Sequence, residues 1–420
     1  MALGTGFTDK TLSNDDITQI VAQSLDSARL DGKRVLMIVP DHTRTAPVDI
    51  MFKTIYGLLA PKVAALDVII ALGTHHALPM EMIYQRVGIG AEEHARDFSK
   101  TRFFNHHWDN PDHLTVIGKL TNEQTAKLTD GKLVMEVDIL INKMVLDYDH
   151  LMIVGPVFPH EVVGFSGGNK YLFPGIAGSQ ILDFFHWLGA LITNPSIIGN
   201  KYTPVRAVVD KAAGYVPTPK SCFAMVVKGN DLAGLYCGTP EEAWSTAADL
   251  SGKLHITYKD HPFHTVLSRA PEMYDDIWVG GKCMYKLEPV VADGGTLIIY
   301  APHITEISHT HGEVLDQIGY HTRDYFVKQW DEYKHFPWGV IAHSTHVKGI
   351  GRYENGIESP RVQVILATSI PEERCRQVNL GYLDYKQVRI DDYENRENEG
   401  ILHVPKAGEM LYRLKKAAGV

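Results

Sequence analysis

A glycine-rich loop between residues 155 and 186 holds the densest set of chemically capable residues in this chain. Its glycines are at positions 164, 167, 168, 175 and 178, and Lys170 lies among them. Glycine permits positive φ, so such a loop can turn several backbone amides toward one anion, such as a phosphate. Lys170 adds a positive charge or a nucleophilic amine, and His160 and His186 lie 10 residues before it and 16 residues after it. These residue types predict a ligand site; the alternative is a tight turn with a solvent-facing lysine. The loop matches neither G-x-x-x-x-G-K-[ST] nor G-x-G-x-x-G.

Two earlier segments repeat one pattern, in which polar residues follow an apolar run. Asp41-His-Thr-Arg44 follows the run 33–39, and Gly73-Thr-His75-His76 follows the run 66–72. In open α/β sheets, ligands bind where parallel strands end and helices begin. Asp41 could accept a hydrogen bond from a sugar hydroxyl, and Arg44 could bind a carboxylate or phosphate bidentately; the alternative is an internal Asp–Arg pair. His75 is placed where a general base would be, but the sequence alone does not separate it from His76.

The elements that would position these residues alternate between apolar strands and helices. Strands are expected at 33–39, 66–72, 114–118, 138–142, 150–154, 223–227, 277–281 and 362–368, and residues 290–300 are expected to be a turn leading into a buried strand. Helices are expected at 47–59 (with Thr45 as a possible cap), from 79, from 179, at 203–213 and at about 405–418. The cluster at 105–109 (NHHWD) is expected to be a surface turn. The alternation predicts an α/β protein of two domains with mostly parallel sheets, with the active site in the crevice between the domains. The expected domains are residues 1–270 plus about 400–420, and residues 271–399.

Composition limits the classes of partner. The net charge of −9 and the lack of a basic block argue against nucleic acid, and no apolar run is long enough to span a membrane. The four cysteines form no C-x-x-C pair. A soluble cytoplasmic protein is expected, of unspecified oligomeric state. The 21 histidines, about twice the number we would expect, favour metal or proton chemistry.

These motifs together resemble the nickel-pincer-nucleotide-dependent lactate racemase family, over both domains. The resemblance is carried by Asp41–Arg44 with Pro47, by Gly73-Thr-His75, and by the spacing of His160, Lys170 and His186. It implies a pyridinium-3,5-bisthiocarboxylic acid mononucleotide that binds one nickel ion and is covalently linked to Lys170, with His186 as the protein ligand to nickel. It implies maturation enzymes that make this cofactor. It also implies that His75 and His160 are the acid/base pair. The nucleotide and the charged end of the substrate would be contacted by Asp41, Thr43, Arg44, Ser166, Gly167 and Gly168.

Physical chemistry agrees with those implied roles. The C2 hydrogen of a 2-hydroxy acid is a poor acid, but it can leave as hydride while a base takes the hydroxyl proton. The planar keto acid can then be reduced on either face, so a base is needed on each side. Histidine, with an ordinary pKa of about 6.5, holds either protonation state near neutrality. Nickel accepts imidazole and soft sulfur ligands together.

The departures from the family pattern lie where substrate is expected. The lactate enzymes carry Gly-Gly-x-Pro-Lys-Asp, whereas this chain reads GGKCMYK from position 280, so Lys282 or Lys286 could replace the carboxylate-binding lysine. His76 stands where the family usually has arginine. The sequence therefore predicts a racemase or epimerase of a 2-hydroxy acid other than lactate, such as a sugar acid or a dicarboxylate.

Two other classes of function compete with this prediction. A metal-dependent phosphoryl-transfer or hydrolytic enzyme would use the glycine loop as a phosphate cradle, but it would need clustered carboxylates for Mg²⁺, and the motif loops offer only Asp41 and Glu161. A cofactor carrier without activity would lack a base or the lysine, and this chain has both histidines and Lys170.

Overall fold

The computed structural model describes residues 2–415, which form two compact units. The first unit contains the chain up to Phe158, then Phe165–Leu182 and Pro204–Leu254. The second contains Pro159–Gly164, Asp183–Thr203 and the described chain from His255 onward. The expected boundary at 270/271 and the expected return of residues 400–420 to the first domain differ from this division, because strands at 263–269 and 401–404 are neighbours in the second sheet.

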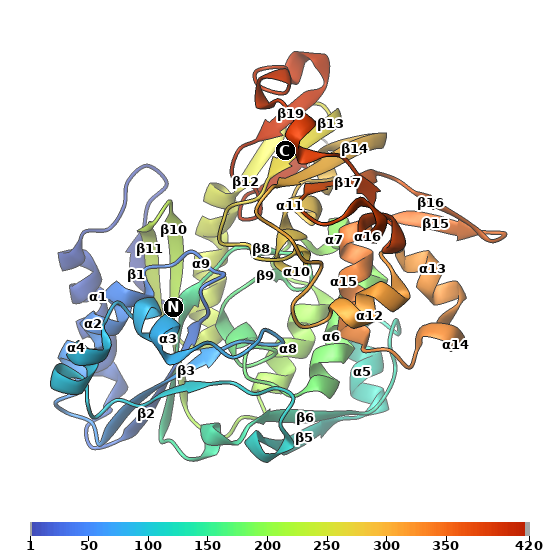
Figure 1. The fold of residues 1–420 in the computed structure, drawn as a ribbon. Coiled ribbons are helices and arrows are strands. Elements are labelled where there is room, and N and C mark those ends of the chain that lie inside the picture. Colours follow the sequence, from blue (N-terminus) through green and yellow to red (C-terminus); the bar gives the residue numbers. More distant parts are fainter. Residues whose placement is uncertain (1, 416–420) are drawn as a thin grey trace. The chain divides into compact units, whose positions relative to one another are not determined.

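The first unit is built on a seven-stranded sheet whose order is β1-β11-β10-β7-β2-β3-β4. The strands are β1 (Leu3–Gly6), β11 (Asp231–Gly238), β10 (Lys220–Lys228), β7 (His150–Pro156), β2 (Arg34–Pro40), β3 (Ala65–Ala71) and β4 (Phe103–Asn105). The five strands from β10 to β4 pair in parallel, and β11 and β1 add on antiparallel. In Figure 1 blue β1 and yellow-green β11, the first and last strands of this sheet along the chain, lie side by side.

Burial on both faces explains the continuous apolar runs of the central strands. Alternate residues of β2, such as Val35, Met37 and Val39, pack into one core with α1 (Asn14–Ala28) and α2 (Val48–Leu59). The other helices of this unit are α3 (Met80–Arg86), α4 (Ala91–Asp97), α5 (Asn122–Leu128), α8 (Pro204–Ala213) and α9 (Pro240–His255). The helix α6 (Ser179–Ile192) begins in this unit and ends in the second.

The second unit contains a five-stranded sheet that is parallel throughout. Its order is β18 (Gly381–Tyr382), β17 (Gln363–Thr368), β14 (Val291–Ala301), β13 (Phe263–Arg269) and β19 (Ile401–Val404). Its helices include α7 (Asn194–Ile197), α10 (Ile277–Gly280), α11 (Lys282–Tyr285), α12 (Gly312–Ile318), α13 (Arg323–Lys328), α14 (Trp330–Tyr333), α15 (Trp338–Lys348) and α16 (Glu372–Gln377). The prediction of an α/β protein with two mostly parallel sheets is therefore confirmed.

Several expected elements are wrong in detail. The segment 277–281 is a helix and not a strand, because the Asp276 carboxylate accepts a hydrogen bond from the Val279 amide and caps α10. The strands near 114–118 and 138–142 are β5 (Leu114–Leu120) and β6 (Val137–Asn142), an antiparallel ribbon outside the main sheet. The helix α2 starts at Val48 without a side-chain cap, so Thr45 does not cap it.

The C-terminal helix expected at about 405–418 is replaced by β20 (Leu411–Leu414), which pairs in parallel with β12 (Ile256–Lys259); residues 416–420 lie outside the described part of the chain. His106 is buried and donates a ring N–H to the Ala177 carbonyl at 2.9 Å, so the cluster at 105–109 is not simply a surface turn. Burial lowers the pKa of His106 to about 4. None of the helices within residues 2–415 is long and apolar enough to cross a membrane.

Candidate active site

The first unit brings the turns after β2 and β3 together through an Asp–His pair. The Asp41 carboxylate lies 2.5 Å from His75 Nδ1. Its other oxygen accepts hydrogen bonds from the Thr43 amide at 3.1 Å and the Thr43 hydroxyl at 2.8 Å. Both β2 and β3 end at the same edge of the parallel sheet, which is why residues 34 positions apart meet.

The charge state of Asp41 follows from these neighbours. Burial alone would raise the pKa of its carboxyl, but the facing His75 and the nearby Arg44 guanidinium lower that pKa far below its ordinary value. Asp41 is therefore a carboxylate under all ordinary conditions. This geometry also separates two neighbouring histidines, since His75 is bound to Asp41 whereas His76 is exposed.

Arg86 and Tyr171 lie near the Asp41–His75 pair. The sequence had indicated neither residue. The Arg86 guanidinium donates to the backbone carbonyls of Pro40, Ala46 and Arg44 and so fixes the loop that carries Asp41. The Tyr171 ring packs under Gly155, where a Cβ would lie 2.2 Å from the ring. Burial raises the pKa of Tyr171 far above its ordinary value. A lone arginine on a helix carries no sequence signal of such a role.

Lys170 lies on a short 3-10 turn, Gly168–Tyr171, and is partly exposed. The turn is anchored by Asn169, whose amide donates to Asp210 at 3.0 Å and to Glu241 at 2.6 Å. The Gly175 amide donates to the Lys170 carbonyl, and the Gly73 amide donates to the Gly175 carbonyl at 3.0 Å. The lysine loop is thus tied to the same turn that carries His75.

The glycine loop itself is held by buried side chains. Arg206 donates to the carbonyls of Phe165 and Gly167, and its guanidinium lies 4.0 Å from the centre of the Trp244 ring. Trp244 Nε1 donates to the Ser166 carbonyl at 3.0 Å. Burial lowers the pKa of Arg206 to about 10, which leaves it charged at neutral pH.

Close packing explains the adjacent glycines better than an open anion cradle does. A Cβ at Gly167 would lie 2.6 Å from the Val157 side chain, and one at Gly168 would lie 2.8 Å from Trp244. The Ser166 hydroxyl accepts from the Phe158 amide and donates to the Pro156 carbonyl, and the Ser166 amide donates to the Phe158 carbonyl. Direct cofactor contacts from Ser166, Gly167 and Gly168 remain a prediction, and the bonds in the structure assign Ser166 to bracing the loop.

Replacing Arg206 with methionine is expected to destabilise the protein by about 2–4 kcal/mol, because two buried carbonyls lose their donor and the contact with Trp244 is lost. Urea unfolding, followed by tryptophan fluorescence, measures this. Arg96→Met is the matched control, since Arg96 forms an exposed pair with Asp97 and its loss should cost less than about 1 kcal/mol. Equal stability of both variants would show that Arg206 does not brace the loop.

The second unit contains His160 and His186, and each is described within that unit alone. His160 is buried on β8 (Pro159–His160), and its Nδ1 accepts a hydrogen bond from the Val162 amide at 3.1 Å. The Glu161 carboxylate lies 3.3 Å from the same nitrogen. His186 lies on α6 and is half-buried.

Three further histidines accompany His186 in the second unit. His343 and His346 lie on α15, and His311 lies at the start of α12; all three are buried. Burial, together with the neighbouring imidazoles of His346, His311 and His186, holds the pKa of His343 well below its ordinary value. Trp278 stacks on His343 with ring centres 4.1 Å apart. The excess of histidine in the composition was the only sequence signal for this group.

The two lysines predicted to bind substrate differ in their environment. Lys286 is buried and its amine donates to the Glu409 carbonyl at 3.0 Å, so it has a structural role. Lys282 is buried on α11, and its amine lies 4.7 Å from the centre of the Tyr274 ring. Binding of the substrate carboxylate by Lys282 stays a prediction.

No group of three or more His, Cys, Asp or Glu residues that could hold a metal ion occurs within residues 2–415. A nickel ion bound to His186 would therefore need further ligands from a bound cofactor, which suits the soft sulfur donors of a pincer nucleotide.

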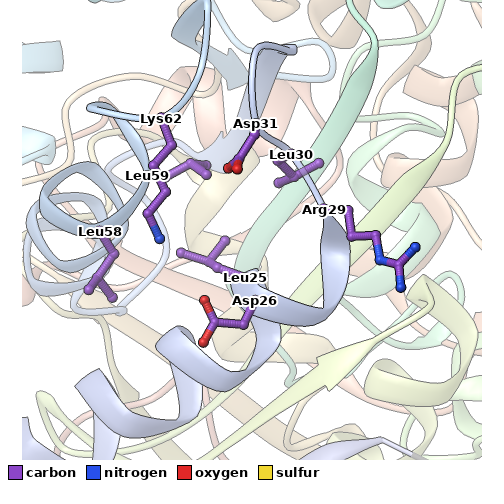
Figure 2. A pocket seen from close by; sticks show the side chains of 8 residues that line it. All are labelled: Leu25, Asp26, Arg29, Leu30, Asp31, Leu58, Leu59 and Lys62. Carbon is purple, nitrogen blue, oxygen red and sulfur yellow. The ribbon is translucent and has the colours of Figure 1, made fainter.

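A pocket in the first unit lies away from these residues. It is lined by Leu25, Asp26, Arg29, Leu30, Asp31, Leu58, Leu59 and Lys62, shown in Figure 2. These residues end α1 and α2 and come just before β2 and β3 begin. The pocket is thus at the amino ends of the strands, opposite the edge where α/β sheets bind ligands.

Comparisons with known proteins relate this chain to lactate racemases. Residues 15–197 match the family model of the lactate racemase N-terminal domain. The lactate racemase of Thermoanaerobacterium thermosaccharolyticum is 25% identical over 315 residues, covering 72% of this chain and 68% of that protein. The lactate racemase of Lactiplantibacillus plantarum is 24% identical over 305 residues, covering 70% and 65%.

Two solved structures share the fold. A crystal structure of a protein from Thermotoga maritima superposes with a TM-score of 0.89 and 31% identity, covering 98% of this chain and 100% of that one. The lactate racemase apoprotein from T. thermosaccharolyticum gives a TM-score of 0.69 at 18% identity, with the same coverage.

Proposed function

This chain belongs to the lactate racemase family, and on that premise we propose that it is a racemase or epimerase of a 2-hydroxy acid. The observation that carries the proposal is the pairing of His75 with Asp41 at the ends of two neighbouring parallel strands. A carboxylate that fixes one imidazole nitrogen is a recurring device for making the other nitrogen a base.

The Asp41 carboxylate sets the proton position on His75. Because an anionic carboxylate only accepts hydrogen bonds, it holds the proton of neutral His75 on Nδ1. The lone pair is then on Nε2, which can take the hydroxyl proton of a 2-hydroxy acid. The His75 side chain is 26% exposed, so the imidazole is partly open to solvent.

His160 is the proposed second acid/base group, and its surroundings differ. The Val162 amide donates to Nδ1, which favours the tautomer with the proton on Nε2. The Glu161 carboxylate, 3.3 Å from the same Nδ1, would instead accept a proton held there. These two competing partners allow His160 to hold a proton on either nitrogen, which suits a group that alternates between acid and base.

A nickel-pincer nucleotide fits the residues of this chain. Lys170 would hold the nucleotide covalently through its amine, His186 would ligate the nickel, and Thr43 and Arg44 would contact the nucleotide. When bound, this group supplies the acceptor for the C2 hydride. The proposed part of the protein is to bind the substrate carboxylate through Lys282 and to move the hydroxyl proton through His75 and His160.

The proposal is tested by co-expression with cofactor-maturation enzymes and chiral chromatography of single enantiomers of 2-hydroxy acids. We expect conversion of at least one acid to its C2 epimer, and no conversion by protein made without the maturation enzymes. Hydrolysis of phosphate or ester substrates without epimerisation would favour the competing hydrolytic function. The engaged amides of the glycine loop do not favour it.

Asp41→Asn is expected to lower turnover by about 10²–10⁴-fold, because an amide no longer holds the His75 proton on Nδ1 as a carboxylate does. The effect should be in kcat, with KM changed little, as measured by initial rates of epimerisation. Asp49→Asn is the control, since Asp49 lies in the first turn of α2 and away from His75. A variant with full activity would show that the Asp41–His75 pair is not used in catalysis.

The same substitution has a predictable effect on stability. The pKa of Asp41 is lowered in the folded protein, so its ionised form contributes stability that is complete above its unfolded pKa of about 3.9 and is lost as the pH falls below that value. The stability difference between wild type and Asp41→Asn should therefore shrink as the pH falls below about 4. Urea unfolding at each pH measures it; a difference that grows as the pH falls below about 4 would contradict the assignment.

His186→Ala is expected to lose most of the bound nickel while the nucleotide stays on Lys170, because only the protein ligand to the metal is removed. Elemental analysis gives the nickel content, and intact mass gives the nucleotide content. His335→Ala, which removes an exposed histidine of the same unit, should retain both. Full nickel occupancy in His186→Ala would refute its role as ligand.

A further inference from the structure

The helix α6 carries His186, the proposed nickel ligand, and it is fixed near both ends to other parts of the second unit. Near its start, Asp183 bonds to the first turn of α15. Near its end, Ala190 lines a small cavity together with Thr345 and His346 of α15. The part of α6 from Asp183 onward belongs to the same unit as α15, and green α6 and orange α15 lie side by side in Figure 1.

The attachment at the start of α6 is the Asp183 carboxylate. It accepts a hydrogen bond from the Gly339 amide at 2.8 Å, and the Trp338 amide bonds to it as well. The residue that precedes α15, Pro337, offers no side-chain cap. Asp183 therefore supplies, from another helix, the acceptor that the first amides of α15 need.

Capping alone does not explain why this residue is a carboxylate. Burial raises the pKa of Asp183 to about 6, which shows that the fold disfavours the charge even though the two amides favour it. A serine or asparagine just before α15 would cap that helix without placing a carboxylate in a buried site. What the carboxylate adds is a connection between α15 and α6, three residues before His186.

The face of α6 that carries His186 is turned toward α14 and α15. Asp183, His186 and Trp187 share this face, because helix residues three and four positions apart are neighbours. Trp187 stacks on Trp330 of α14, with ring centres 4.8 Å apart and planes 8° from parallel. His186 is close enough to α15 for its charge to lower the pKa of His343. Contacts to Asp183 and Trp187 thus fix the turn of α6 that holds His186.

The attachment at the end of α6 is Asn194. Its side-chain amide donates to the Tyr285 carbonyl at 2.9 Å and to the Glu288 carboxylate at 3.2 Å. Glu288 also accepts from the Ile350 amide at 2.8 Å, two residues after α15 ends. Thr193 takes a φ of 85°, which is strained for a β-branched residue. Such strain persists only where the surrounding contacts hold the chain, so the end of α6 is firmly fixed.

We propose that Asp183 and Asn194 are positioning residues, which fix α6 near both ends and so hold His186 where it can ligate nickel. This inference rests on the proposed function, in which His186 is the protein ligand to the metal. Residues that orient a metal ligand act on metal affinity through that ligand. A ligand on a helix that is held near both ends is presented more precisely than one on a free segment.

The cofactor-free protein tests the positioning of His186 without any activity. Diethyl pyrocarbonate modifies accessible imidazoles, and peptide mass spectrometry gives the rate at each histidine. In Asp183→Ala and in Asn194→Ala we expect the rate at His186, relative to the exposed His335, to rise at least about 3-fold, because a released helix opens more often. Thermal unfolding of each variant measures its stability separately.

The nickel content of matured protein tests the consequence for the metal. During dialysis against a chelator, Asp183→Ala and Asn194→Ala should release nickel at least about 10-fold faster than wild type, because removing groups that orient a metal ligand weakens binding by that order. Intact mass should show that the nucleotide stays on Lys170. The controls are Asp331→Ala and Asn398→Ala, at exposed positions of the same unit, and both should match wild type in nickel release and in His186 reactivity.

Asp183→Asn guards against misfolding, since it keeps one acceptor oxygen and should give values between those of wild type and Asp183→Ala. If Asp183→Ala does not fold, wild-type values in Asp183→Asn would overturn the inference. Lower thermal stability with wild-type His186 reactivity and wild-type nickel release would show a merely structural role and would also overturn it. If His186→Ala keeps its nickel, the proposed ligand itself fails; if it loses nickel while the variants at 183 and 194 keep theirs, only the positioning role fails.

Discussion

Lys170→Ala is expected to abolish both covalent attachment of the cofactor and all epimerase activity, while the fold is retained. The primary amine is the only group at this position that can form the proposed link, and no neighbour on the 3-10 turn offers another. Because Lys170 is partly exposed and the turn is held by Asn169, the loss of its side chain should change stability little. Intact mass of protein matured in cells measures the adduct, and chiral chromatography measures the activity.

Two variants make this result specific. Lys170→Arg keeps the positive charge but not the amine, so it should also lack the adduct. Lys211→Ala removes an exposed lysine of the first unit and should keep both adduct and activity. An adduct of unchanged mass in Lys170→Ala would show that the cofactor is attached elsewhere or not covalently, and the role of Lys170 would then have to be abandoned.

The parts of the fold that follow from local patterns were predicted well. The apolar runs before Asp41 and His75 are central strands, and a strand buried on both faces needs no alternation of polar residues. Once these runs are assigned to a parallel sheet, the turns after them must meet at one edge. The proximity of Asp41 and His75 could therefore be expected from sequence, although their direct pairing could not.

Features that depend on contacts between distant segments were missed or misjudged. The strand expected at 277–281 is a helix because of one capping bond from Asp276, which outweighs the β-forming residues that follow. The adjacent glycines of the central loop suggested an anion cradle, but they are explained by close packing: Gly167 against Val157, and Gly168 against Trp244, which comes from a helix more than seventy residues later. The position of an arginine such as Arg206 under that loop has no sequence signature at all.

The two proposed acid/base histidines are held in different ways, and this difference has consequences for catalysis. His75 has a single strong partner that fixes one tautomer, whereas His160 has an amide donor and a carboxylate competing for one nitrogen. A racemase must act on both enantiomers, so one base must be ready and the other group must be able to return a proton. Under the proposed function, His75 would be the base with a fixed tautomer, and His160 would be the group that can exchange its proton position.

The His75→Ala and His160→Ala variants are each expected to lose full racemisation but to retain opposite half-reactions. Every complete turnover takes the hydroxyl proton to one histidine and returns a proton from the other, so neither variant should interconvert enantiomers. In a single turnover, however, the enantiomer whose hydroxyl proton goes to the remaining histidine should still form the 2-keto acid. Loss of a general base typically costs about 10²–10⁴-fold, so trapped keto acid from each pure enantiomer should reveal the asymmetry.

His76→Ala is the control that decides whether this asymmetry belongs to His75. His76 is adjacent in sequence but exposed, whereas His75 is held by Asp41, so His76→Ala should keep both half-reactions within a few-fold of wild type. If His75→Ala and His160→Ala lose the same half-reaction, the two histidines do not serve opposite enantiomers. If His76→Ala reproduces the loss expected for His75→Ala, the base is His76 and the Asp41 pair has a structural role. Asp41→Asn should lose the same half-reaction as His75→Ala, and only that one. The reason is that the Asp41 carboxylate affects proton transfer through the imidazole that it holds. That result would link the carboxylate to the function of His75.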